Sequence, residues 1–225
     1  MNSPRSSRIV LCLCAGAVSL GAGCASAGRG PYSAQSEADR NPLEAQRLSM
    51  QAAAILDALN EQETIPPGAP GHAEQLAEHA EQLARAEALL RRALTADLYC
   101  GPAHNNLGVV YLAQSPARLY EAASEFAFAQ RLMPGAPDPR MNLALTLERA
   151  GKLDDALAAY RSALDASPAH LPSIQAIARL QIRHARADDR TRDYLGELAL
   201  RSDPAWRSWA RAQLARGTSS TPIGE

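Results

Sequence analysis

Apolar residues recur at helical spacing through most of the chain. Over about 42–63 and again over about 72–97, Leu, Ile and Ala return every three or four residues, with charged and amide side chains between them. This spacing places the apolar side chains on one face of an α-helix. Val and Ile are scarce and aromatic residues make up only 4% of the chain, which argues against a β-sandwich or barrel. The pattern therefore predicts an all-α protein.

A longer pattern repeats in the middle of the chain. Residues 137–168 can be set beneath residues 101–134 so that small, aromatic and proline positions coincide. Four pairs are each 34 residues apart: Ala122 and Ala156, Phe126 and Tyr160, Ala129 and Ala163, and Pro134 and Pro168. Such a period indicates tandem units of one supersecondary structure.

The order of residues within this repeat resembles the tetratricopeptide repeat (TPR). Residues 107–134 contain Leu-Gly-x-x-Tyr, then Ala-x-x-x-Phe, then Pro, as that repeat does, although His104 and Arg140 replace its Trp. The resemblance implies antiparallel helix hairpins that stack into a right-handed superhelical solenoid. Gly108 is expected to be small because the helix axes approach closely, and Gly151 is expected to end the first helix of its hairpin.

The repeat extends outward in weaker form and divides the chain into segments, with about nine helices expected. We predict a signal peptide (1–23), a flexible tether (24–41), an irregular N-terminal hairpin or degenerate repeat (42–100), two TPR units (101–136 and 137–170), a degenerate unit (171–204), a capping helix (205–216) and a disordered tail (217–225). In the first hairpin, Leu76, Leu83 and Leu90 are seven residues apart. This stripe predicts core packing against the preceding helix, and a homotypic helix–helix contact is the alternative.

The first residues have the composition of an export signal. Arg5 and Arg8 precede an apolar run over 9–20, and small residues follow. As a helix this run is about 18 Å long, which is too short to span a bilayer. Residues 20–24 resemble the lipoprotein box of bacteria, in which Cys24 receives diacylglycerol and becomes the new N-terminus. Cleavage after Ala25-Ser26-Ala27 is the alternative, and it would remove Cys24.

The residues around Cys24 also suggest a destination. Ala25, rather than Asp, follows the cysteine, and by resemblance to Gram-negative sorting this implies an outer-membrane lipoprotein that faces the periplasm. A soluble periplasmic or secreted protein is the alternative. Because Cys12 and Cys14 leave with the signal peptide, no disulfide framework is expected. Cys100 has neither His nor Asp at motif spacing, so we interpret it as a packed or neutral position.

The sequence carries no motif of enzymatic chemistry. A phosphate loop, a zinc-type CxxC pair, HExxH and Gly-x-Ser-x-Gly are all missing from the 225 residues. His72 and His79 share a helix face with Glu78 and could in principle hold a metal, but the surrounding Glu and Gln favour a solvated surface. The acidic pairs that open two predicted helices, 154–155 and 188–189, are explained by helix N-terminal electrostatics. We expect a protein without enzymatic activity, cofactor or metal.

The TPR resemblance implies that the chain binds a protein or peptide partner in a concave groove lined by the first helix of each hairpin. The groove positions are Asn105, Val109, Leu112, Met141, Leu145, Glu148, Arg149, Gln175, Arg179, Ile182 and Arg183. Val109 and Leu145 stand where related proteins carry residues that clamp the carboxylate tail of chaperones, so that ligand is not expected. Nucleic acid is not expected either, because the predicted export removes the chain from that target.

The charge of the groove gives a sharper hypothesis. Arg179, Arg183, Arg186 and Arg190 form one helical stripe, and Arg149 stands inward on the neighbouring unit. Such guanidiniums could bind an acidic segment or a free carboxylate, and charge reversal at Arg179 and Arg183 would then abolish binding with stability nearly unchanged. The alternative is a solvated end unit in which three acids neutralise the stripe: Asp188, Asp189 and Asp193.

Overall fold

A computed structural model describes residues 35–218 of the chain. The predicted signal peptide, the predicted lipidation site Cys24, most of the predicted tether and the end of the predicted tail lie outside the described residues. Within residues 35–218, a short 3-10 helix, η1 (Glu37–Asp39), precedes nine α-helices, and there is no strand. The predicted all-α fold class is confirmed.

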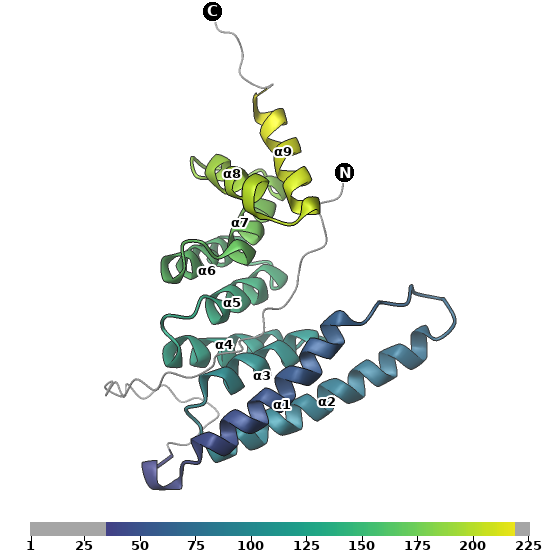
Figure 1. Cartoon of the computed structure of the whole chain (residues 1–225), viewed down its shortest axis with the longest axis vertical. Coiled ribbons are helices and arrows are strands. Elements are labelled where there is room, and N and C mark those ends of the chain that lie inside the picture. The colour runs from purple at the N-terminus through teal and green to yellow at the C-terminus, as the bar shows by residue number, and fades with distance from the viewer. Residues whose placement is uncertain (1–34, 219–225) are drawn as a thin grey trace, which may run out of the picture. The chain divides into compact units, whose positions relative to one another are not determined.

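Pairs of consecutive helices pack against each other, and the largest contacts join α1 to α2, α3 to α4, and α5 to α6 (Figure 1). The helices are α1 (Pro42–Glu61), α2 (His72–Ala96), α3 (Gly101–Ala113), α4 (Leu119–Leu132), α5 (Asp138–Arg149), α6 (Leu153–Ala166), α7 (Leu171–Arg183), α8 (Thr191–Arg201) and α9 (Pro204–Thr218). They fall into two compact units, one that ends at Pro134 and one that begins at Gly135. None of the helices between residues 35 and 218 combines the length and the apolar composition that a membrane span requires.

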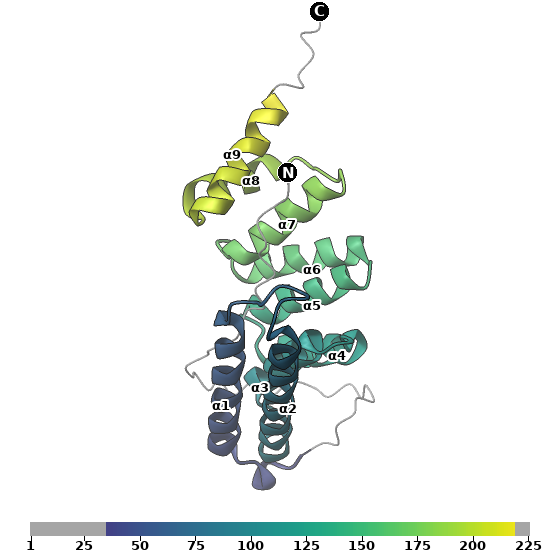
Figure 2. The same ribbon diagram turned by 90° about the vertical axis from the view of Figure 1, so that its right-hand side faces the viewer.

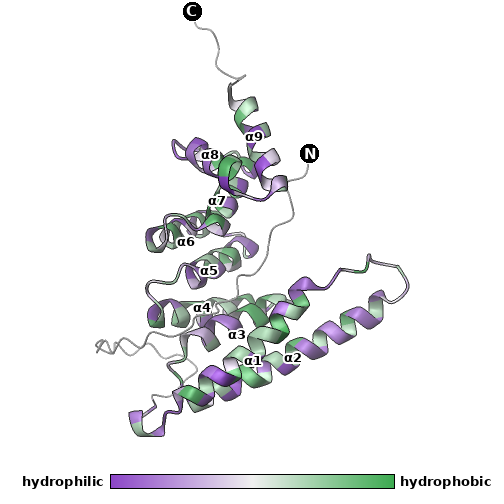
Figure 3. Ribbon diagram, viewed as in Figure 1, coloured by the Kyte–Doolittle hydropathy of each residue, from purple (hydrophilic) through white to green (hydrophobic). Residues whose placement is uncertain are grey.

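The first unit consists of α1 to α4. Helix α1 packs along α2, both contact α3, and α3 packs against α4. Hydrophobic and hydrophilic residues alternate along α1 and α2 (Figure 3), as expected of helices with one buried face. The predicted packing of the leucine stripe is confirmed for Leu83 and Leu90, which are buried, and is wrong for Leu76, which is 57% exposed. Leu76 lies toward the loop end of the hairpin, where no buried residue occurs between Asp57 and Gln82.

The second unit consists of α5 to α9, and each of its helices packs on the next one along the chain. Gly151 has a left-handed φ of 76°, and the N–H of Lys152 donates to the carbonyl of Leu147 over 2.9 Å. This geometry satisfies a free carbonyl at the end of α5, and it confirms the predicted helix end at Gly151. At the other end of the unit, Trp206 and Ala210 of α9 are buried.

Candidate functional site

Gly108 and Phe126 meet at the centre of the α3–α4 hairpin. A Cβ atom on Gly108 would lie 2.6 Å from Cε1 of Phe126 and 2.8 Å from both Cδ1 and Cζ. Phe126 is fully buried, as are Ala122 and Ala129 beside it in α4. The ring thus occupies the space that any larger residue at 108 would need, which confirms the predicted close approach of the two helices.

The α5–α6 hairpin buries the corresponding residues. Ala144 and Ala156 are fully buried, and Tyr160, which stands 34 residues after Phe126, is 1% exposed. Because the same positions face inward in both hairpins, the repeat read from the sequence is a repeat of packing. The α3–α4 and α5–α6 hairpins are therefore packed in a TPR-like way.

His104, at the position of the repeat's Trp, forms a buried polar cluster. Its Nδ1 lies 2.6 Å from Oε2 of Glu125, and its Nε2 lies 2.9 Å from the carbonyl oxygen of Leu98. The imidazole ring also stacks on Phe128 at a centroid distance of 5.1 Å. Both ring nitrogens are used inside the unit, so His104 acts in packing. The sequence offered no signal for Glu125 as its partner, because the two residues are 21 positions apart.

A second buried cluster joins three helices of the second unit. Nη2 of Arg179 in α7 donates to Oε2 of Glu148 in α5 over 2.7 Å, and the hydroxyl of Tyr160 in α6 donates to the same oxygen over 3.0 Å. The side chains of Arg179 and Glu148 are only 8% and 12% exposed. Because water is largely excluded, the attraction between these two charges is stronger than the attraction within a surface ion pair.

The pKa values of this cluster reflect burial and the shared carboxylate. Burial disfavours the charged form of Arg179, but the hydrogen bond and charge of Glu148 outweigh it and raise the pKa of the guanidinium. Burial, followed by the charge of Glu148, raises the pKa of the Tyr160 phenol far above its ordinary value. The arginine is thus held charged and the tyrosine neutral.

Two other arginines of the predicted stripe, Arg186 and Arg190, have contacts within the second unit. Arg186 pairs with Asp154 of α6, and the guanidinium of Arg190 lies over the ring of Tyr194, 5.3 Å from its centroid. Asp188 pairs instead with Arg161 of α6 over 2.6 Å. The prediction that Asp188, Asp189 and Asp193 neutralise the stripe is therefore wrong for the paired arginines, whose carboxylate partners come from α5 and α6. The ion pair also changes the expected effect of charge reversal at Arg179: the new carboxylate would face Glu148, so we expect the variant to lose stability.

The eleven residues predicted to line a partner groove divide by exposure. Those at most 7% exposed are Asn105, Val109, Leu112, Met141, Leu145 and Arg179. Glu148, Gln175 and Ile182 are half-buried, and Arg149 and Arg183 are exposed. Arg149 and Arg183 are the last residues of α5 and α7, where a cation is stabilised by the helix dipole. In the second unit, these two guanidiniums and the half-buried residues near them form the accessible part of the predicted surface.

The predicted weak metal candidates lie near the turn between α1 and α2. Nδ1 of His72 lies 2.8 Å from the carbonyl oxygen of Ile65, so this ring nitrogen is already used to hold the turn. Within residues 35–218, no group of three His, Cys, Asp or Glu side chains is placed to hold a metal ion.

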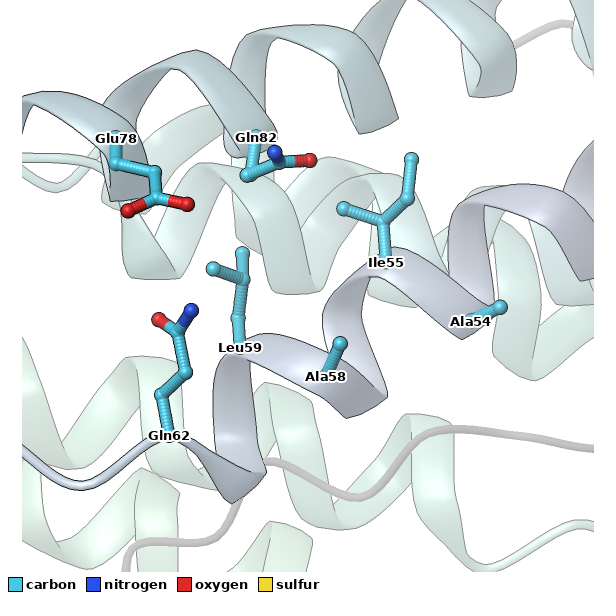
Figure 4. A pocket seen from close by; sticks show the side chains of 7 residues that line it. All are labelled: Ala54, Ile55, Ala58, Leu59, Gln62, Glu78 and Gln82. Atoms are coloured by element: carbon cyan, nitrogen blue, oxygen red, sulfur yellow. The ribbon is translucent and has the colours of Figure 1, made fainter.

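A pocket that the sequence did not predict lies between α1 and α2 (Figure 4). It has a volume of about 290 Å³ and is lined by Ala54, Ile55, Ala58, Leu59 and Gln62 of α1 and by Glu78 and Gln82 of α2. A signal for it was present: two alanines four residues apart, next to two large aliphatic residues, on a helix with a polar partner. The pocket is a candidate contact surface separate from the predicted groove.

Comparisons with known proteins give limited similarity. The sequence matches no protein-family model and no curated protein. Among solved structures, the chain is similar to MamA (residues 41 to the end) from Desulfovibrio magneticus RS-1, with 15% identity, a TM-score of 0.43, and coverage of 79% of this chain and 98% of that one. It is also similar to YrrB, described as a TPR protein with an unusual peptide-binding site, with 18% identity, a TM-score of 0.32, and coverage of 72% and 99%. The TPR-like character of this chain is argued from the packing of its own hairpins and not from these structural neighbours.

Proposed function

We propose that this protein is a non-enzymatic scaffold that binds a protein or peptide partner. The observation that carries the proposal is the repeated hairpin packing, with Gly108 against Phe126 and its counterparts Ala144 and Tyr160 buried 34 to 36 residues later. In the TPR proteins that the repeat resembles, the first helix of each hairpin lines the binding surface. In this chain the accessible cations on that surface are Arg149 and Arg183, so the partner segment carries carboxylates.

The binding proposal is tested by reversing these two charges. The double variant Arg149→Glu with Arg183→Glu should leave the fold intact, since both side chains are exposed. When the variant is cross-linked in its own cells, the partner proteins that bind this surface should no longer be recovered with it. The matched control is Arg192→Glu with Arg201→Glu, which reverses two exposed arginines of α8 in the same unit. Quantitative mass spectrometry of the cross-linked proteins compares the two variants. Equal recovery from both variants, or no protein enriched over an untagged control, would refute a binding surface at these residues.

We further propose that the scaffold is an outer-membrane lipoprotein of a Gram-negative bacterium, anchored through Cys24 at the periplasmic face. The support is the order of residues 1–24: basic start, short apolar run, small residues and cysteine. In this setting the bound partner belongs to a complex of the cell envelope.

The anchor is tested by Cys24→Ser. The variant should lose the mass of the lipid and move from the membrane to the soluble fraction. An unchanged mass and unchanged fractionation would support the alternative, a soluble periplasmic or secreted subunit of a larger assembly, which the motif Ala25-Ser26-Ala27 favours.

A further inference from the structure

The loop half of the first hairpin, residues 54–82, is here called the arm. It contains the end of α1, the turn, and the beginning of α2, and its two helices lie side by side in both views (Figures 1 and 2). The 26 consecutive residues from Asp57 to Gln82 include none that is buried. Among the described helices of the first unit, the arm therefore consists of two whose apolar side chains are not buried by a third.

The arm is nevertheless fixed in shape by its turn. The side chain of Gln75 accepts a hydrogen bond from the N–H of Ile65 and donates one to the carbonyl of Glu63, both over 2.8 Å. His72 contacts the carbonyl of Ile65, and Gly71 adopts a left-handed φ of 84° that starts α2. A surface held in this way can receive a partner without first being ordered.

The pocket of Figure 4 lies on this arm, and its shape suits a helix. Ile55 and Leu59 are half-buried and supply apolar surface between α1 and α2, while Ala54 and Ala58 are exposed and four residues apart. Small residues at this spacing let a third helix approach closely, with its side chains in the groove between the first two. Bound in this way, the third helix would cover the aliphatic side chains that the arm leaves uncovered.

The charge of the arm defines the partner further. The 37 residues between Arg47 and Arg85 contain six acids and neither Lys nor Arg. The acids are Asp57, Glu61, Glu63, Glu74, Glu78 and Glu81. Across the described part of the chain, none of these six carboxylates takes part in an ion pair. One of them, Glu78, stands at the pocket itself.

We propose that the arm binds a basic amphipathic helix of a partner protein, with its aliphatic side chains against Ile55 and Leu59 and its Lys or Arg residues beside the arm's carboxylates. A second copy of the arm is disfavoured because two acidic arms repel each other. The basic helix α9 of a second copy is disfavoured as well, since its apolar residues Trp206 and Ala210 are buried and Trp209 and Leu214 are half-buried in its own unit. This surface is independent of Arg149 and Arg183.

The probe is a synthetic helix of about 18 residues, or five turns, with Leu on one face and Lys on the other. Its binding to the full chain is measured by fluorescence anisotropy. A matched peptide with Glu in place of every Lys is the charge control. We expect the Lys peptide to bind, with an affinity that falls as salt is added, and the Glu peptide not to bind.

Two variants of the chain locate the binding. Ala58→Arg fills the pocket and should weaken binding by at least about tenfold, equivalent to about 1.4 kcal/mol. Ala88→Arg adds the same charge at an exposed position of α2 outside the pocket and should weaken binding less than about threefold, as expected of a screened surface charge. Circular dichroism confirms that both variants are folded.

Several results would overturn the proposal. The Lys peptide could fail to bind, the Glu peptide could bind equally well, or the two arginine variants could weaken binding equally, which would indicate unspecific charge attraction. If sedimentation showed a dimer that Ala58→Arg dissociates, the pocket would hold a second copy of the chain. None of these results would affect the surface at Arg149 and Arg183.

Discussion

Two glycines in helices should respond in opposite ways to the same substitution. Gly108 lies in the middle of α3, and Gly196 lies in the middle of α8. A Cβ atom on Gly108 would meet the buried ring of Phe126 at 2.6 to 2.8 Å, whereas a Cβ atom on Gly196 would meet nothing within 4 Å. Gly108→Ala should therefore destabilise the protein, and Gly196→Ala should stabilise it.

The magnitudes follow from two opposing effects. Alanine is better than glycine in a helix by about 1 kcal/mol, and this gain applies at both positions. At Gly108, overpacking of a filled core costs about 2 to 3 kcal/mol, the upper part of the usual range, because Phe126 is fully buried and has little room to move. We expect a net loss of about 1 to 2 kcal/mol for Gly108→Ala and a gain of about 0.5 to 1 kcal/mol for Gly196→Ala.

Urea unfolding with two probes measures both changes. Far-UV circular dichroism follows all helices, while fluorescence follows only the second unit, because both tryptophans of the chain, Trp206 and Trp209, lie in α9. Gly196→Ala should raise the midpoint of the fluorescence transition. Gly108→Ala should lower the urea midpoint at which the helices of the first unit unfold, as followed by circular dichroism. Thermal midpoints should move by about 4 to 8 °C for each kcal/mol if that unit melts alone.

A double variant checks the cause. Phe126→Leu should destabilise on its own by removing core volume, and its cost together with Gly108→Ala should be less than the sum of the two, because the smaller side chain makes room for the new methyl group. Strict additivity would show that the two residues do not compete for space. A Gly108→Ala protein as stable as the wild type would refute the close packing of α3 on α4.

Three further predictions concern buried or half-buried side chains. Arg179→Met should lower the free energy of unfolding by about 3 kcal/mol, because it leaves Glu148 without its ion-pair partner. Adding Glu148→Gln should recover part of this loss in the same urea assay. An equal or larger loss in the double variant would contradict the pairing. Burial raises the pKa of the Cys100 thiol, so its alkylation at about pH 8 should be slower than that of glutathione and should become faster in urea. An alkylation rate in the native protein equal to that of glutathione would contradict the shielding of this thiol. Because the pKa of Tyr160 is raised in the folded protein, its contribution to stability should be complete below about pH 10 and should be lost as the pH rises further. Tyr160→Phe should remove this part of the alkaline loss of stability. An unchanged dependence of stability on alkaline pH in the variant would contradict the role of Tyr160.

The elements and the internal packing of the hairpins could be predicted because they depend on local patterns. Helices α1 and α2 follow from apolar spacing, and the burial of Phe126 and Tyr160 follows from their shared place in a repeat. Gly151 marked the end of α5 because a left-handed residue commonly closes a helix, and glycine adopts that conformation without the steric cost of a Cβ atom.

The polar contacts could not be predicted because they join residues far apart in the sequence. Glu148 and Arg179 were both assigned to the inward face, but their spacing of 31 residues says nothing about whether they bind each other or a partner. The exposure of Leu76 was missed for a related reason. A heptad of leucines indicates a buried face, but it does not indicate where the covering helix stops.

The ion pair of Glu148 with Arg179 changes what the second unit can bind. Three converging guanidiniums would attract a carboxylate strongly, but one of the three is already neutralised and nearly buried. Arg149 and Arg183 are exposed at the ends of α5 and α7, and charge attraction to exposed guanidiniums is weakened by salt. The arm differs in sign and in kind, since it combines six carboxylates that form no ion pair within residues 35–218 with the half-buried aliphatic side chains Ile55 and Leu59. Apolar burial persists at high salt whereas charge attraction does not, so a partner on the arm should remain bound at salt concentrations that release a partner from the second unit.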